Sequence, residues 1–464
     1  MTNPICTLSA QQLLSAFEKK ALSPVEVMEA ILSQAEAMNP SLNALFGDDP
    51  ENAMTLARAS EQRWQKNQPQ GYLDGLPITV KDSIKTIGFP SWHGCRANMH
   101  KPLDKEDAPP AARLKEAGAI IFAKTAMPDI GMLACGVSSA HGIVRNAWNT
   151  DFNPGGSSAG AATAVAAGIG PCAIGTDGGG SVRLPAAHCG LFGFKPTNGR
   201  IPHTPPDPIR TAGPLTRNVA DSALLMNVLS QPDSRDFGSL PPLNVDYLAN
   251  LERDLKGLKL GLLLDIGFEP FVSDEVVSAV KKGAEVFQAS GGRIEPVSLE
   301  FDFDPMAAVE RYFMVRSFLE YDALTPDQKQ QVLPYVARWV EGAPAISGIQ
   351  LADALVKIDR IRTIVRERFE DYDYIISPVM PTVGFPAEAL GVDGDHPIAH
   401  IGYAGLYNQT GQPASSICCG FAENGLPIGL QIIGKRYDDL GVLQLSCAYE
   451  QRRGFEIPWP MSIQ

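Results

Sequence analysis

Short apolar segments alternate with amphipathic segments along most of this chain, and the alternation limits the folds it can adopt. Apolar runs of strand length lie at 76–80, 120–125, 171–177, 258–265, 293–299, 371–378 and 425–434. Strands that alternate with helices predict helical layers packed on a largely parallel or mixed sheet. We therefore expect an α/β fold, with a mixed central β-sheet flanked by helices.

Helix boundary signals support this reading. Ser23 is a typical N-cap, Pro24 suits the first helical position, and Glu26 completes a capping box. Five further helices are expected: one that starts near Ser9, one at 109–117 that stops at Gly118, a small-residue helix at 159–168, one from about Ser273, and one from about Leu440 to the end of the chain.

Composition bounds the class of protein. The 464 residues carry 39 basic and 52 acidic side chains, a net charge of −13, and no Lys/Arg-rich run. This argues against a nucleic-acid-binding surface. No sharp break in composition divides the chain, and 231–242 resembles a surface loop rather than a linker. We therefore expect residues 1–464 to form a single domain.

Targeting signals and membrane spans are not expected. The first residues, MTNPICTLSAQQLL, lack a basic region and an apolar region of the kind found in signal peptides. The most apolar stretch, 161–175, is short and is broken by glycine and proline, so it is too short to span a bilayer. The eight cysteines form no C-x-x-C pair, which favours reduced thiols in a cytoplasmic protein.

A glycine-rich loop, GTDGGGSVRLP at 175–185, carries a candidate nucleophile. Three glycines precede Ser181, although glycine is costly to order. Consecutive glycines let backbone N–H groups point at one spot, where they bind developing negative charge. Ser181 is therefore a candidate nucleophile whose acyl intermediate the loop would stabilise. The alternative is an ordinary loop serine.

A serine nucleophile needs a base, and the residues alone leave several candidates. His188 and His203 flank glycine-rich loops, so either could pair with a serine. Lys81 ends the apolar run 76–80, and burial there would lower the pKa of its ammonium group.

Two weaker patterns compete with this site. The sequence GSSAG at 156–160 matches a nucleophile elbow centred on Ser158, but polar turn residues stand where the elbow requires a strand. His396 and His400 have no third metal ligand nearby, and no H-E-x-x-H pattern occurs. We expect neither a metal site nor a cofactor.

Several segments together resemble the amidase signature family. They are GLPITVKD at 75–82, FAKTAMPDIG at 122–131, GGSSAGAATAVAAG at 155–168, GTDGGGSVRLPAAHCGLFGFKPTNGR at 175–200 and GLPIGLQIIG at 425–434. The resemblance covers nearly the whole chain in matching order. It implies the amidase signature fold in a single amidase domain.

The resemblance also implies a Ser–Ser–Lys triad. Ser181 would be the nucleophile, Ser157 the bridging serine held by a cis peptide bond, and Lys81 the base. The backbone N–H groups of the oxyanion hole would come from Gly178, Gly179, Gly180 and Ser181. Supporting roles behind the triad would fall to Ser158, Asp177 and Arg183, with Arg183 equally suited to a structural ion pair. The family uses the positions of Lys124 and Lys195 structurally.

Three positions depart from the family pattern. Ala159 stands where the serine motif usually has glycine, and its methyl group suits a helix start. The family member that amidates mischarged tRNA, as one subunit of a complex, shares the triad, but it typically has Thr in place of Gly178 and Gln in place of Leu184. These differences favour a free-standing hydrolase. The alternative is a component of a glutamyl- or aspartyl-tRNA amidotransferase complex, similar to that amidating subunit.

The expected activity is hydrolysis of linear, non-peptide carboxylic amide C–N bonds, with esters and carbamates as further candidates. Aromatic segments broken by glycine or proline at 311–324, 376–386 and 401–411 are candidates for a largely apolar pocket. They favour aryl or alkyl amides. The expected partner is a small-molecule amide. The family is often dimeric, so a homodimer is one expectation, and the sequence leaves the oligomeric state open.

Overall fold

The computed structural model describes residues 3–268, 272–393, 396 and 398–461. Its central feature is a sheet of eleven strands in the spatial order β1-β3-β2-β6-β8-β7-β12-β13-β11-β9-β10. The strands are β1 (Leu45–Phe46), β2 (Pro77–Lys81), β3 (Ile120–Thr125), β6 (Cys172–Asp177), β7 (Phe192–Lys195), β8 (Thr211–Thr216), β9 (Lys259–Leu262), β10 (Arg293–Pro296), β11 (Tyr374–Pro378), β12 (Ala414–Phe421) and β13 (Pro427–Ile433). A separate two-stranded ribbon joins β4 (Val137–Ser138) and β5 (Gly142–Ile143).

The large sheet is mixed, as the sequence predicts. β2 runs parallel to both β3 and β6, and β9 runs parallel to both β10 and β11. The neighbours β6–β8, β8–β7, β7–β12, β12–β13 and β13–β11 are antiparallel, as is β1 on β3. Every residue of β2, β3, β6 and β8 is buried, so helices or loops cover both faces there.

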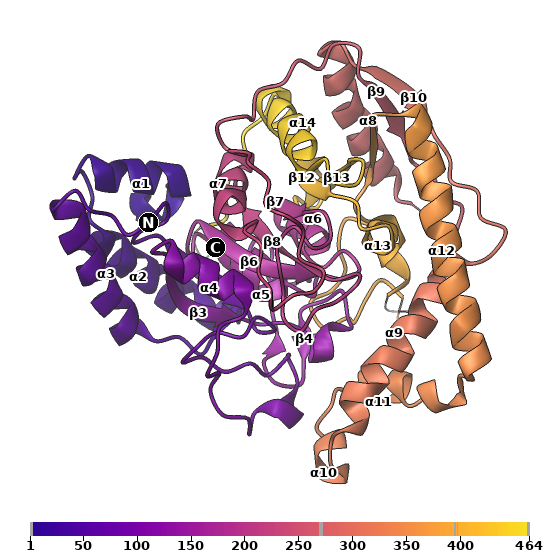
Figure 1. The fold of residues 1–464 in the computed structure, drawn as a ribbon, viewed down its shortest axis with the longest axis horizontal. Coiled ribbons are helices and arrows are strands. Elements are labelled where there is room, and N and C mark those ends of the chain that lie inside the picture. The colour runs from indigo at the N-terminus through magenta and orange to yellow at the C-terminus, as the bar shows by residue number, and fades with distance from the viewer. Residues whose placement is uncertain (1–2, 269–271, 394–395, 397, 462–464) are drawn as a thin grey trace.

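Helices surround this sheet (Figure 1). They are α1 (Ala10–Glu18), α2 (Pro24–Leu42), α3 (Pro50–Gln65), α4 (Pro109–Glu116), α5 (Ala159–Ala166), α6 (Arg183–Cys189), α7 (Val219–Leu229), α8 (Asp274–Ala289), α9 (Pro305–Asp322), α10 (Pro326–Lys329), α11 (Pro334–Val340), α12 (Gly348–Asp371), α13 (Gly402–Gln409) and α14 (Asp439–Arg452). α5 and α6 pack on each other and on the central strands, while α4, α7, α14 and α8 form a second continuous row. α9, α11 and α12 pack together as an arm at one side, with α10 at its tip.

Local signals in the sequence explain several of these boundaries. The side chain of Ser23 accepts from the N–H of Glu26, and the Glu26 carboxylate accepts from the N–H of Ser23, so the predicted capping box is present. Gly118 has φ +88° between α4 and β3, a conformation that suits glycine. Ser273 is the N-cap of α8, as predicted.

One predicted boundary is wrong. The last helix, α14, ends at Arg452 rather than at the chain end, and Gly454 follows with φ +78°. None of the described helices is both long and apolar enough to cross a membrane. All eight cysteines are buried free thiols.

Candidate active site

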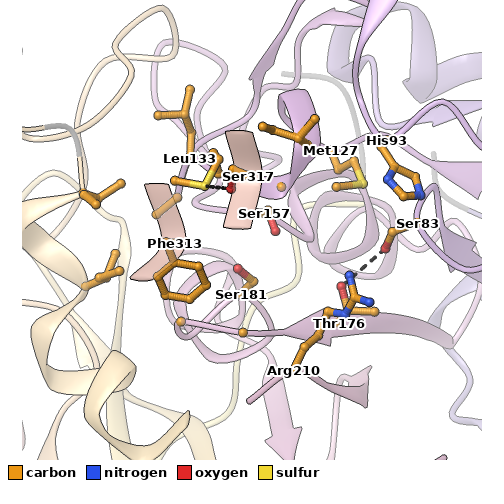
Figure 2. Close-up of a pocket in the computed structure, with 18 of the residues that line it drawn as sticks. Ser83, His93, Met127, Leu133, Ser157, Thr176, Ser181, Arg210, Phe313 and Ser317 are labelled. Carbon is orange, nitrogen blue, oxygen red and sulfur yellow. Dashed lines mark hydrogen bonds between the residues drawn. The ribbon is translucent and has the colours of Figure 1, made fainter. Parts of the chain in front are cut away.

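Three separate segments of the chain meet at one cavity. Lys81 is the last residue of β2, Ser157 lies just before α5, and Ser181 lies in the loop between β6 and α6. β2 pairs with β6, which places the carboxyl ends of these parallel strands side by side. All three residues line the same cavity of about 130 Å³. Figure 2 shows the side chains of Ser157 and Ser181 turned toward this space.

Lys81 is buried, with 1% of its surface exposed. Its Nζ donates to Ser157 Oγ at 2.7 Å and to the carbonyl oxygen of Thr176 at 3.3 Å. Burial lowers the pKa of Lys81 from 10.5 to about 7, because an ammonium group is poorly solvated there. The charge of Asp177 raises this pKa and that of Arg210 lowers it, so the two partly offset each other. A large share of Lys81 is therefore neutral near pH 7 and able to accept a proton.

Ser157 follows a cis peptide bond from Gly156, as the resemblance implies. The backbone is packed so closely here that a Cβ atom on Gly156 would lie 2.4 Å from the carbonyl oxygen of Cys135. Glycine is therefore required at 156, because a side chain would collide with backbone atoms. This packing fixes Ser157 between Lys81 and the cavity.

The glycine loop presents part of its backbone to the cavity. Gly178, Gly179 and Ser181 line the cavity, and their N–H groups donate to no acceptor among the described residues. Gly180 differs, because its N–H donates to Asp177 Oδ1 at 2.7 Å. The expected place of Gly180 in the oxyanion hole is therefore corrected: its N–H is already used. Gly180 serves the turn, with φ +107°.

Asp177 and Arg183 fix the shape of this loop. Both side chains are fully buried, and Arg183 Nε and Nη2 donate to the two carboxylate oxygens at 3.0 Å each. Burial alone would raise the pKa of Asp177, but the charge and hydrogen bonds of Arg183, together with the charge of Lys195 and the hydrogen bond from Asn408, outweigh it and hold that pKa below its usual range. Asp177 also accepts from the N–H of Val182 at 3.1 Å. The pair thus orients the backbone on both sides of Ser181, and neither residue lines the cavity.

Ser158 joins the serine segments rather than facing the cavity. Its Oγ donates to the carbonyl oxygen of Thr176 at 3.2 Å and accepts from the Thr176 N–H at 3.3 Å. Its own N–H donates to the carbonyl oxygen of Ser181 at 3.2 Å. These bonds hold the start of α5 against β6 and the loop. No strand directly precedes Ser158, so the elbow alternative lacks its structural context.

The rival bases lie elsewhere. Lys124 Nζ donates to the carbonyl oxygen of Ile84, and Lys195 Nζ donates to that of Pro196 at 3.0 Å. Burial lowers the lysine pKa values to about 8 and about 7 respectively. Neither of these lysines, nor His188 or His203, is among the residues that line the cavity.

The two histidines are also poor bases by their surroundings. Burial lowers the pKa of His188 to about 4, and its Nδ1 lies 3.2 Å from the carbonyl oxygen of Asn153. Burial likewise lowers the pKa of His203, with the charge of Arg210 adding to the effect. In the described part of the chain, no group of three or more His, Cys, Asp or Glu residues could hold a metal ion.

The cavity walls include residues from two of the three segments that are candidates for a pocket. Phe313, Ser317 and two charged residues come from 311–324, and Ile401 comes from 401–411, whereas 376–386 does not line the cavity. The segment from Met127 to Ala134 contributes another wall that sequence reasoning missed. Four charged or titratable side chains of the cavity were given no role by sequence reasoning: His93 and Arg210, which lie outside the predicted segments, and Arg316 and Glu320, which lie within 311–324. Nothing in their local sequence marks them, because distant segments bring them together.

Known proteins are similar to this chain over nearly its whole length. The A-type subunit of the glutamyl-tRNA(Gln) amidotransferase of Chloroflexus aggregans is 32% identical over 93% of this chain and 93% of that protein. An acylamidase of Rhodococcus erythropolis is 30% identical over 97% of this chain and 96% of that protein. A solved bacterial aryl acylamidase of the amidase signature enzymes has a TM-score of 0.92 at 29% identity, over 100% of each chain.

More distant structures share the fold. The peptide amidase of Stenotrophomonas maltophilia has a TM-score of 0.85 at 24% identity, over 98% of this chain and 99% of that chain. The family model described as Amidase matches residues 26–443, which is most of the chain. The chain belongs to the amidase family and has the fold of the amidase signature enzymes.

Proposed function

We propose that this protein hydrolyses carboxylic amides through an acyl-enzyme formed on Ser181. The observation that carries the proposal is the 2.7 Å contact between buried Lys81 Nζ and Ser157 Oγ, in the wall of the cavity that Ser181 also lines. A lysine with a pKa of about 7 is matched to proton transfer near neutral pH. The two serines and the lysine thus supply a nucleophile, a relay and a base.

In the first half-reaction, neutral Lys81 accepts a proton from Ser157, which in turn accepts one from Ser181. Ser181 Oγ then forms a bond to the carbonyl carbon, and the π electron pair moves to the carbonyl oxygen. The N–H groups of Gly178, Gly179 and Ser181 stabilise this oxyanion. One such donor is typically worth about 3–4 kcal/mol of transition-state stabilisation.

Collapse of the tetrahedral intermediate breaks the C–N bond. The ammonium group of Lys81 returns the proton through Ser157 to the leaving nitrogen, so a neutral amine departs. Water then repeats the sequence on the acyl-enzyme: its proton passes to Lys81, and the carboxylic acid leaves as Ser181 regains a proton. No external cofactor is needed to balance these steps.

The surrounding residues position these groups. Asp177 and Arg183 fix the loop that carries Ser181, and Ser158 ties that loop to the segment of Ser157. We propose that the whole chain acts as one amidase domain, because the eleven-stranded sheet that carries the site contains both β1, from the N-terminal part of the chain, and β13, from the C-terminal part. Apolar side chains such as Phe313 and Ile401 suit aryl or alkyl amides, and related esters and carbamates fit the same chemistry.

The second candidate function is that of one component in a tRNA-dependent amidotransferase complex. The similarity to the A-type subunit of glutamyl-tRNA(Gln) amidotransferase favours it. Leu184 lines the cavity, and this apolar side chain stands where the amidating subunit typically has Gln, which favours the hydrolase instead. The second candidate requires partner proteins, whereas the first predicts activity from the isolated chain.

The deciding experiment is an assay of the purified chain alone against chromogenic anilides, esters and carbamates. We expect amide hydrolysis without any added protein. Ser181→Ala should abolish both turnover and labelling by a fluorophosphonate, since that reagent reacts with the nucleophilic serine. Labelling that persists in Ser181→Ala but disappears in Ser158→Ala would overturn the assignment of the nucleophile. Amide-nitrogen transfer seen solely with partner proteins and tRNA would favour the second candidate.

A further inference from the structure

One wall of the cavity carries charge beside the nucleophile loop. Arg210 directly precedes β8, and a Cβ atom on Gly178 would lie 3.8 Å from Arg210 Cβ. Figure 2 shows the Arg210 side chain near Thr176, on the same side of the cavity as Ser83 and His93. Arg210 therefore stands next to the backbone that would hold the substrate carbonyl.

The carboxylate nearest to Arg210 is already engaged. Asp207 Oδ1 accepts from the N–H groups of Ile209 and Arg210 at 2.9 Å each. Asp207 Oδ2 makes a close ion pair with Arg316 Nη2. Arg210 Nε lies 3.7 Å from that same oxygen, which is too long for a hydrogen bond. Asp207 therefore pairs more closely with Arg316 than with Arg210, and no carboxylate among the described residues is hydrogen-bonded to the Arg210 guanidinium group.

The acidic side chain in the cavity wall, Glu320, is paired as well. Glu320 Oε1 lies 3.2 Å from His93 Nδ1. Burial alone would raise the pKa of Glu320, but its hydrogen bond to His93 and the charges of His93, Lys101 and Arg210 together outweigh this and lower the pKa. The positive charges of Arg210 and Arg316 equal the negative charges of Asp207 and Glu320 in number. The two arginines therefore differ in their hydrogen bonds rather than in their charge balance.

The donors of Arg210 are those left over. Its side chain is 19% exposed, and Nη2 donates to the carbonyl oxygen of Pro205 at 3.2 Å. Its Nε is shielded from solvent and has no hydrogen-bond partner among the described residues. The shielded Nε is out of a ligand's reach, but Nη1 also has no hydrogen-bond partner among the described residues, and on this cavity-lining side chain it is the donor that a bound carboxylate would use.

We propose that Arg210 binds a carboxylate of the substrate, so that the preferred substrates are amides that carry a carboxylate on either the acyl part or the amine part. This inference rests on the proposed amide hydrolysis and narrows it. The planar guanidinium fork matches a carboxylate better than a lysine would. The apolar wall formed by Met127, Phe313 and Ile401 would hold the rest of the substrate.

The wild-type enzyme gives the first test, with two matched substrate pairs. Glutaryl anilide is compared with pentanoyl anilide for an acyl-side carboxylate. Butyryl 4-carboxyanilide is compared with butyryl 4-acetylanilide for an amine-side carboxylate. We expect kcat/KM to favour the charged member of one pair by about 10- to 100-fold, the range for hydrogen bonds to charged groups. Equal rates, or a preference for the neutral member in both pairs, would overturn the proposal.

Variants then assign the preference to Arg210. Arg210→Met should remove most of it, and Arg210→Lys should keep an intermediate preference because the charge remains. Arg58→Met removes an exposed arginine on α3 and should leave the preference unchanged. Because the preference is a ratio measured within each variant, a general loss of activity cancels. A preference that survives in Arg210→Met would refute the role of Arg210.

A binding measurement separates this inference from the proposed function. Ser181→Ala protein is titrated by calorimetry with glutaryl anilide, butyryl 4-carboxyanilide and their neutral partners, with and without Arg210→Met. Tighter binding of a charged compound that depends on Arg210 would support the site even if the wild-type protein hydrolysed none of the amides. Equal binding of charged and neutral compounds would overturn it, even if the wild-type protein hydrolysed all of them.

Discussion

Replacing Lys81 with methionine should separate the two tasks expected of this lysine. Methionine keeps an unbranched side chain in the buried space but has no amine. An amide nitrogen leaves poorly unless it is protonated, whereas a nitrophenolate leaves readily without a proton. Both substrates lose the base that activates Ser181, and the amide also loses its acid. We therefore expect Lys81→Met to damage anilide hydrolysis more than hydrolysis of a nitrophenyl ester with the same acyl group.

The structure gives the scale of the effect. With a pKa of about 7, about half of Lys81 is neutral at pH 7, whereas at its ordinary value of 10.5 about one molecule in 3,000 would be. That difference corresponds to about 5 kcal/mol, which burial supplies in the folded protein. General acid–base catalysis contributes about 10²–10⁴-fold, so the ratio of ester to anilide kcat/KM should rise by about 100-fold or more.

The assay compares kcat/KM for the two substrates in wild type, Lys81→Met, His188→Ala and His203→Ala. The histidine variants are the controls, because both histidines are buried away from the cavity and should leave the ratio unchanged. If Lys81→Met retained amide activity while a histidine variant lost it, the lysine mechanism would be wrong. Loss of ester and amide activity by the same factor would refute the role of Lys81 as acid.

Further outcomes can be checked on the same preparations. Wild-type kcat/KM for an anilide should rise with pH through an apparent pKa near 7, because neutral Lys81 is the active form, and a profile flat across neutral pH would contradict this. Thermal stability should also rise with pH between about 7 and 10.5, where the unfolded chain keeps a proton on Lys81 that the folded protein has lost, and Lys81→Met should reduce that rise. Gly180→Ala should lower both kcat/KM and the melting temperature, because the new Cβ would lie 2.6 Å from Ala404 Cβ at φ +107°; a fully active, equally stable variant would disprove this packing. Chelators should leave activity unchanged, and loss with chelator followed by recovery with a metal ion would show otherwise.

The buried strands nearest the site were predictable because each is a short apolar run. β2, β3 and β6 are all such runs, and together they position Lys81 and the glycine loop. β8 was not predictable in the same way, since Gly213 and Pro214 argue against a central strand. In the structure a Cβ atom on Gly213 would lie 2.1 Å from the carbonyl oxygen of Phe194, so glycine is needed where β7 passes closely. The reason for that glycine is visible once its neighbour is known.

The site was predictable in its members but not in its geometry. Lys81 and Ser157 are 76 positions apart, and their spacing gives no sign that they meet. The family resemblance assigned both to one triad, and the structure shows the contact between them. The direction of the Gly180 N–H depends on Asp177, and glycine runs alone do not reveal which N–H groups stay free. Arg210 was missed because its role depends on the ion pair between Arg316 and Asp207. These two residues are more than a hundred positions apart in the sequence.

The C-terminal segments contribute to the nucleophile loop through one buried arginine. Arg183 pairs with Asp177, and it also donates to Asn408 Oδ1 at 2.7 Å and to Gln431 Oε1 at 2.6 Å. Gln431 lies in β13 and is itself held, because its Nε2 donates to the carbonyl oxygen of Tyr403 at 3.0 Å. A buried charge needs all of its hydrogen bonds. Loss of the acceptor at Asn408 or at Gln431 would therefore weaken the ion pair between Arg183 and Asp177. The segment GLPIGLQIIG, which resembles a family segment, thus has a structural role. Its glutamine holds Arg183, and Arg183 in turn holds the loop that carries Ser181.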